Sequence, residues 1–160
     1  MMGVGKSTIG TFLSKKLKME FHDVDEIIEK KYSLTIRQIF EKHGEPFFRK
    51  IEEEETLFLI EKENGVIALG GGSFMNEKLR KRIKETALSV WLDLNINELL
   101  KRTKINHKRP LLDYGKTKES LEKILNERKK IYSMADHKIS CDFKSKEEIV
   151  DEISKIYESE

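Results

Sequence analysis

The sequence contains one cysteine, Cys141, and only two prolines among its 160 residues. One cysteine excludes a disulfide within the chain and suits a reducing compartment. Because Cys141 ends a short apolar run, we predict a buried structural thiol rather than a nucleophile. No apolar run approaches the roughly 20 residues of a membrane helix, and the first residues do not resemble a signal peptide. We therefore expect a cytoplasmic protein.

Neither sign of charge is in excess, since 31 Lys and Arg face 29 Asp and Glu, a formal net charge of +2. This balance gives no global indication of a protein that binds nucleic acid or a membrane surface. The chain also lacks internal repeats, low-complexity tracts and recognisable linkers. Its length fits one domain, and we expect residues 1–160 to form it.

Residues 3–8, Gly-Val-Gly-Lys-Ser-Thr, are the last part of the phosphate-loop pattern Gly-x₄-Gly-Lys-Ser/Thr. In this pattern backbone N–H groups surround a phosphate chain, the lysine reaches the terminal phosphates and the hydroxyl binds Mg²⁺. The next run, residues 9–17, has apolar residues at 9, 12, 13 and 17, which predicts a helix. Its N-terminus would face the anion.

The first glycine of that pattern is missing, because it would fall immediately before Met1. The apolar strand that normally leads into such a loop is missing as well. We therefore expect that this sequence begins inside its own phosphate loop, as a mis-assigned start or a truncation would produce.

Short apolar runs alternate with amphipathic segments along the rest of the chain. The runs at 20–25, 66–69, 88–93 and 137–141 predict strands. The segments between and after them predict helices, at 26–31, 35–40, from 45 onward, 76–85, from about 97, 118–134 and 147–157. This alternation indicates an α/β fold of three layers, a parallel sheet with helices on both faces. The missing strand would bring the sheet from four strands to five.

Two carboxylates, Asp23 and Asp25, end the first predicted strand. Alternation would place both on one side of the strand, at the edge of an α/β sheet where ligands bind. Asp25 can also be the N-cap of the helix at 26–31. The two roles are compatible, and the residues alone leave both open.

Two arginines differ in their relation to the helical apolar stripes. Arg49 lies about 150° from the stripe of Phe47, Ile51 and Phe58, which predicts an exposed charge paired with Glu52 or Glu53. Arg128, by contrast, falls on the apolar stripe of its own helix. Since an unpaired buried charge is costly, we expect a distant carboxylate or an anionic substrate as its partner.

Two further segments favour a ligand site. The three glycines at 70–72 follow a predicted buried strand directly, so a ligand could approach their backbone closely. The basic segment 101–110 lacks apolar periodicity and is predicted to be a mobile loop. Such a loop is suited to cover a nucleotide, although it could also be a simple connector.

Together these motifs resemble the shikimate kinase family, which has the phosphate-loop kinase fold of nucleoside-monophosphate kinases. The resemblance spans almost the whole chain. Beyond residues 3–8 it includes the stretches 21–25, 44–49, 69–72 and 109–112, with Glu52, Arg128 and Tyr132. The phosphate loop alone is widespread, but Gly-Glu-x-x-Phe-Arg, three glycines and Arg-Pro-Leu-Leu together are specific to this family.

The resemblance implies transfer of the γ-phosphate of ATP to the 3-hydroxyl of shikimate, giving shikimate 3-phosphate and ADP, in chorismate and aromatic amino-acid biosynthesis. It implies a monomer that uses ATP and Mg²⁺, with a shikimate-binding part at about 25–60 and a lid at about 104–117. The nucleotide contacts would be Gly3, Val4, Gly5, Lys6, Ser7, Thr8, Arg102 and Arg109. The shikimate contacts would be Asp25, Arg49, Glu52, Gly71, Gly72 and Arg128.

Roles follow from the same resemblance. Asp25 would hold the accepting hydroxyl, while Lys6 and Arg109 would stabilise the transferring phosphoryl group. Ser7 and Asp23 would hold the metal. In this family the missing strand lies in the middle of the sheet, so its absence would open a gap in the core. The alternatives are another small-molecule kinase of this fold, such as a gluconate kinase, or an inactive nucleotide-binding module.

Overall fold

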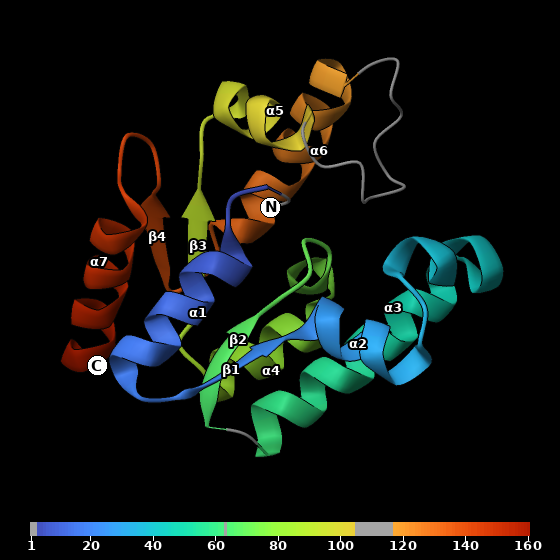
Figure 1. The fold of residues 1–160 in the computed structure, drawn as a ribbon, viewed down its shortest axis with the longest axis horizontal. Coiled ribbons are helices and arrows are strands. Elements are labelled where there is room, and N and C mark those ends of the chain that lie inside the picture. Colours follow the sequence, from blue (N-terminus) through green and yellow to red (C-terminus); the bar gives the residue numbers. More distant parts are fainter. Residues whose placement is uncertain (1–2, 63, 105–116) are drawn as a thin grey trace.

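The computed structural model describes residues 3–62, 64–104 and 117–160. Helices and strands alternate along the chain (Figure 1). The elements are α1 (Lys6–Leu17), β1 (Glu20–Asp23), α2 (Val24–Tyr32), α3 (Ile36–Lys62), β2 (Gly65–Ala68), the 3₁₀ turn η1 (Ser73–Met75), α4 (Glu77–Thr86), β3 (Val90–Asp93), α5 (Ile96–Lys104), α6 (Thr117–Tyr132), β4 (His137–Ser140) and α7 (Lys146–Ser159).

The strands of the described residues form two parallel pairs. β1 pairs with β2, with Glu20 opposite Gly65, and β3 pairs with β4, with Val90 opposite His137. The two pairs are not hydrogen-bonded to each other within the described part of the chain. The predicted α/β architecture with parallel strands is thus confirmed, and the sheet is divided between β2 and β3.

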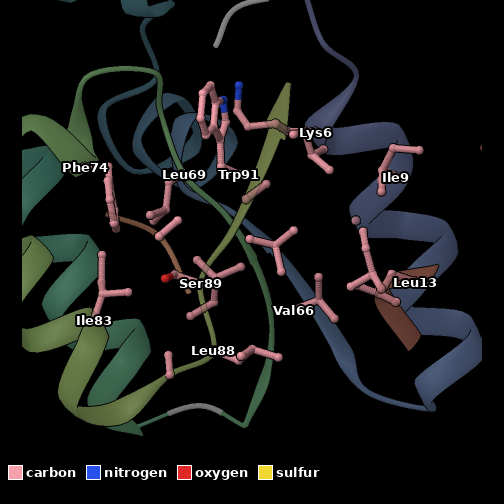
Figure 2. Close-up of a pocket in the computed structure, with 18 of the residues that line it drawn as sticks. Lys6, Ile9, Leu13, Val66, Leu69, Phe74, Ile83, Leu88, Ser89 and Trp91 are labelled. Carbon is pink, nitrogen blue, oxygen red and sulfur yellow. The ribbon is translucent and has the colours of Figure 1, made fainter. Parts of the chain in front are cut away.

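An apolar cavity of about 430 Å³, here called the central groove, lies between β2 and β3. Figure 2 shows Ile9 and Leu13 of α1 on one side of it and Phe74 and Ile83 on the opposite side. The remaining walls come from both strands, and include Val66, Ala68, Val90, Trp91 and Leu92. The gap that was expected in the middle of the sheet is therefore present.

Two hydrophobic clusters stabilise the described part of the fold. The larger joins α1, α4 and α7 to β3 and β4, and α1 lies side by side with α7 (Figure 1). The smaller joins α2 to α3 through Val24, Ile28, Ile39, Phe48, Ile51 and Leu59. No helix among the described residues has the length and apolar character needed to cross a bilayer.

The junction of β1 and α2 differs from its prediction. The strand ends at Asp23, and Asp25 already lies in the first turn of α2. Asp23, in extended conformation, is the N-cap, because its Oδ1 accepts hydrogen bonds from the N–H groups of Asp25 and Glu26, at 3.0 and 3.4 Å. The prediction that the two carboxylates alternate along one strand is wrong, and so is Asp25 as the cap.

The α3 segment contains the two predicted helices, divided at Gly44, whose φ of 82° interrupts the helix. The predicted apolar stripe is only partly right. Ile51 is buried, but Phe58 is 55% exposed, and the buried face includes Phe48 and Leu59, which were expected to flank the stripe. These residues face α2, so the packing partner selects one of two apolar rows that the helix offers.

Candidate active site

The phosphate loop begins in a left-handed turn. Gly3 and Gly5 have φ of 73° and 96°, conformations that glycine adopts readily and other residues rarely adopt. Gly5 directly precedes α1, and no side chain caps the helix there. The N-terminus of this 12-residue helix therefore has the position and polarity of other phosphate sites at helix N-termini.

Ser7 and Asp23 meet at the start of α1. The Ser7 hydroxyl donates a hydrogen bond of 2.5 Å to Oδ2 of Asp23, whose Oδ1 caps α2. A hydroxyl and a carboxylate beside a phosphate loop are the hard oxygen ligands that Mg²⁺ prefers. Among the described residues no larger cluster of acidic, His or Cys side chains forms a metal site. The pair therefore fits Mg²⁺ that takes its other ligands from phosphate and water.

The carboxylate of Asp25 lies against the loop of residues 70–73, here called the glycine loop. A Cβ atom added to Gly70 would fall 3.1 Å from Oδ1 of Asp25 and 2.2 Å from Oε1 of Glu52. Gly70 is therefore required for this close approach. The strand pairing explains this proximity. Because Asp23 lies opposite Ala68, the segments that follow β1 and β2 leave the sheet side by side.

Arg49 is held by two carboxylates of its own helix. Its Nη1 donates to Glu52 at 2.8 Å, and its Nε and Nη2 donate to Glu45 at 3.1 and 3.0 Å. Burial alone would lower the pKa of Arg49, but hydrogen bonds and charge from Glu52 and Glu45 outweigh it and raise this pKa. The Arg49 side chain is 31% exposed, so the predicted fully exposed charge is wrong, whereas the predicted pairing with Glu52 is confirmed.

Glu52 is a buried carboxylate that connects Arg49 to the glycine loop. It is 2% exposed, with one oxygen on Arg49 and the other accepting a 2.8 Å hydrogen bond from Ser73. The Arg49 guanidinium also approaches this loop, since a Cβ at Gly72 would fall 2.3 Å from its Nη1. The role of Ser73 was not predicted from the sequence. Its position directly after three glycines was the only local signal.

Arg128 approaches the same loop from α6. Its Nη1 donates a 2.8 Å hydrogen bond to the carbonyl oxygen of Gly71, and the Tyr132 hydroxyl donates to that oxygen as well. Arg128 is half-buried, in keeping with its place on an apolar stripe. Among the described residues its hydrogen-bond partner is a backbone carbonyl. Two guanidinium groups thus contact neighbouring glycines, an arrangement suited to a carboxylate ligand.

Two predicted nucleotide contacts cannot be placed. Arg109 lies outside the described residues, as does the predicted lid at 104–117 except for its two end residues. Arg102 belongs to α5, but its side chain is not described. Lys6 does have a defined place. It is the first residue of α1 and lines the end of the central groove, where Figure 2 shows it close to Trp91.

A glycine turn that opens a helix, with Lys6 and Ser7 in its first turn and parallel strands ending beside it, defines a nucleotide-binding protein of the phosphate-loop class. The family model described as shikimate kinase matches residues 2–158. The chain belongs to the shikimate kinase family, which confirms the resemblance seen in its motifs.

Individual relatives agree with this assignment. The chain is 44% identical to the shikimate kinase of Aquifex aeolicus over 149 residues, 93% of this chain and 87% of the relative. It is 41% identical to that of Bacillus subtilis over 154 residues, 95% and 82% of the two chains. Its fold is similar to the solved shikimate kinase of Acinetobacter baumannii in complex with shikimate, with a TM-score of 0.93, 32% identity and coverage of 99% and 89%.

Proposed function

We propose that this chain transfers the γ-phosphate of ATP to the 3-hydroxyl of shikimate. The observation that carries the proposal is the convergence of Arg49 and Arg128 on the glycine loop, which lies next to Asp25 and lines the same cavity as Lys6. Two guanidinium groups are suited to bind one carboxylate in a fixed plane. That carboxylate would orient the shikimate ring so that one hydroxyl faces the phosphate.

On the nucleotide side, residues 3–8 would surround the phosphates through their backbone, and Lys6 would neutralise charge on the transferring group. Ser7 and Asp23 would hold Mg²⁺, which when bound supplies further neutralisation of phosphate charge. Arg109 and Arg102 are proposed to contact the nucleotide from the lid and α5. The chain is proposed to act as a single-domain monomer.

On the acceptor side, Arg49, Arg128 and the backbone of Gly71 and Gly72 would bind shikimate, with Glu52 orienting Arg49. Asp25 would accept the proton of the attacking hydroxyl or orient that hydroxyl toward the phosphate. Phosphoryl transfer requires little covalent chemistry from the protein. The protein therefore contributes mainly by aligning the reactants and neutralising charge.

Shikimate-dependent production of ADP tests the proposal directly. ADP that forms only when shikimate and ATP are both present would support it, with gluconate as the control acceptor. Turnover with gluconate instead would favour the related kinase. ATP binding without turnover on either acceptor would favour the inactive nucleotide-binding module.

Substitution of the two substrate arginines is expected to weaken shikimate binding selectively. Arg49→Ala and Arg128→Ala should each cost roughly 2–5 kcal/mol, the range for truncating one partner of a buried charged pair. Apparent ATP affinity should change far less, because the hydrogen bonds of both side chains go to Glu45, Glu52 and the glycine loop. Titration calorimetry with shikimate and then with an ATP analogue measures both.

Arg49→Ala also leaves the buried Glu52 without its cation, so a matched variant is needed. Arg49→Lys keeps a positive charge near Glu52 but lacks the planar fork. It should fold better than Arg49→Ala and still bind shikimate weakly. Arg82→Ala, at a surface ion pair with Glu61 and Glu85, is the control arginine. Intact shikimate binding in both active-site alanine variants would contradict the assignment.

Filling the central groove should raise stability and activity together. About ten added residues before Met1, an apolar run that ends in glycine, would supply a strand between β2 and β3, which are not hydrogen-bonded to each other in the described part of the chain. Each large apolar side chain that becomes buried contributes roughly 1.5–3 kcal/mol, and about 1 kcal/mol raises Tm by roughly 2–4 °C at this size. A gain of about 10 °C is therefore expected.

Calorimetry measures that gain, and the fluorescence of Trp91, the single tryptophan and a groove residue, reports whether the groove is filled. The matched control is an extension of equal length with proline at its centre, since proline cannot donate to the sheet. Equal melting and turnover of the two extended chains would contradict this prediction.

A further inference from the structure

The carbonyl oxygen of Gly71 accepts hydrogen bonds from two side chains of α6. Arg128 donates from Nη1 at 2.8 Å, and Tyr132 donates from its hydroxyl. The two residues are four apart, so they lie one above the other on the same helix face. Because a carbonyl oxygen has two lone pairs, these donors occupy both of its acceptor positions.

The Tyr132 donor is held in a fixed place. The residue is 6% exposed, and its ring packs on Trp91 of β3 with the ring centroids 6.0 Å apart. Burial raises the pKa of Tyr132, although the charge and hydrogen bond of Arg128 act in the opposite direction. The hydroxyl therefore stays protonated and remains a donor at ordinary pH.

Arg128 has a different role in the proposed function, on which this inference rests. A guanidinium recognises a carboxylate best when two of its N–H groups point to the two oxygens in one plane. In the structure one of these N–H groups is engaged by Gly71. The Gly71 carbonyl therefore competes with a substrate carboxylate for Arg128.

We propose that Tyr132 is a positioning residue that keeps the Gly71 carbonyl hydrogen-bonded, so that Arg128 can turn to the substrate carboxylate. Without the hydroxyl, Arg128 would be the remaining donor to this oxygen among the described residues. Turning Arg128 away would then leave a buried carbonyl without a partner, a state that is costly. Tyr132 thus lowers the cost of binding a carboxylate-bearing substrate without touching that substrate.

Tyr132→Phe tests the proposal, because phenylalanine keeps the ring on Trp91 and removes only the donor. The KM and Kd for shikimate should rise about 10-fold, within the range for an unsatisfied buried polar group. The KM for ATP and kcat should each stay within about twofold, because the hydroxyl lies on the acceptor side alone. Tyr157→Phe, at a half-exposed tyrosine of α7, is the matched control and should change none of these values.

A double-mutant cycle separates this role from a merely structural one. In an Arg128→Ala background the Tyr132→Phe change should have no further effect on kcat/KM for shikimate, because the competing guanidinium is gone. A further 10-fold loss in that background would overturn the proposal, as would an unchanged shikimate KM in the folded single variant. A wild-type chain without shikimate-dependent turnover would instead overturn the proposed function, and Tyr132's role with it.

Discussion

Lys6→Ala is expected to lower kcat by about 10²-fold or more, the loss seen when a preorganised electrostatic donor is removed. Lys6 follows the left-handed Gly5 and is the first residue of α1, so its side chain leaves the backbone at the helix N-terminus. A terminal phosphate bound there would gather charge in the transition state. Removing the ammonium group leaves that charge unneutralised in the transition state.

Shikimate binding should be almost unaffected by the same change, since its proposed contacts lie on α2, α3, α6 and the glycine loop. Calorimetry should give a shikimate Kd within about twofold of the wild type, whereas single-turnover kinetics should show the full loss in the chemical step. Lys15→Ala is the control, because it removes the same charge from the exposed face of the same helix. Unchanged turnover in folded Lys6→Ala would remove the phosphate loop from the mechanism.

The overall fold could be predicted because its signals are local. Short apolar runs predicted the four strands of the described residues to within two residues at each end, and the helix predicted at 76–85 is α4, which Asn76 caps by accepting a hydrogen bond from the Leu79 N–H at 3.2 Å. The phosphate loop could also be predicted, since its functional residues are contiguous in the sequence, at positions 3–8.

The placement of the two carboxylates could not be predicted from local pattern. Either Asp23 or Asp25 could have capped α2, as both are good N-cap residues. The choice depends on where pairing with β2 stops, and it stops with Asp23 opposite Ala68. That register is a property of two segments more than 40 residues apart in the sequence.

Arg49 shows the limit of helical periodicity. The 3.6-residue pattern gave its direction relative to one apolar stripe, but it could not show that the 70–73 loop covers that side of the helix. Ser73 and Gly72 arrive from a distant segment and turn an exposed position into a half-buried one. The position of Arg128 was easier to predict, because a charged residue on an apolar stripe indicates a buried side chain that needs a polar partner.

Asp25→Asn is expected to lower kcat by about 10²-fold or more while the protein stays folded, since positioned bases contribute about 10²–10⁴ in rate. Asp25 lies at the glycine loop, where an acceptor hydroxyl would meet the phosphate. Asparagine keeps the size of the side chain but cannot accept that proton. ATP binding should remain normal, because the contacts of the phosphate loop are unchanged.

The free energy of unfolding should change little in Asp25→Asn, because Asp25 is not the cap of α2. Asp23 caps α2, so Asp25→Asn removes no cap, and the free energy of unfolding should fall by less than the about 1 kcal/mol that a lost cap costs. The nearby buried carboxylate of Glu52 also favours a neutral neighbour. Thermal unfolding measures this, and Glu26→Gln, an exposed acid in the same turn, is the matched control.

The size of the kinetic loss distinguishes two roles for Asp25. A loose, dissociative transition state needs little proton removal, so a loss near 10²-fold would indicate that the carboxylate mainly orients the hydroxyl. A loss near 10⁴-fold would indicate general base catalysis. If folded Asp25→Asn turned over as fast as Glu26→Gln, Asp25 would have no catalytic role, and its close approach to Gly70 would be packing alone.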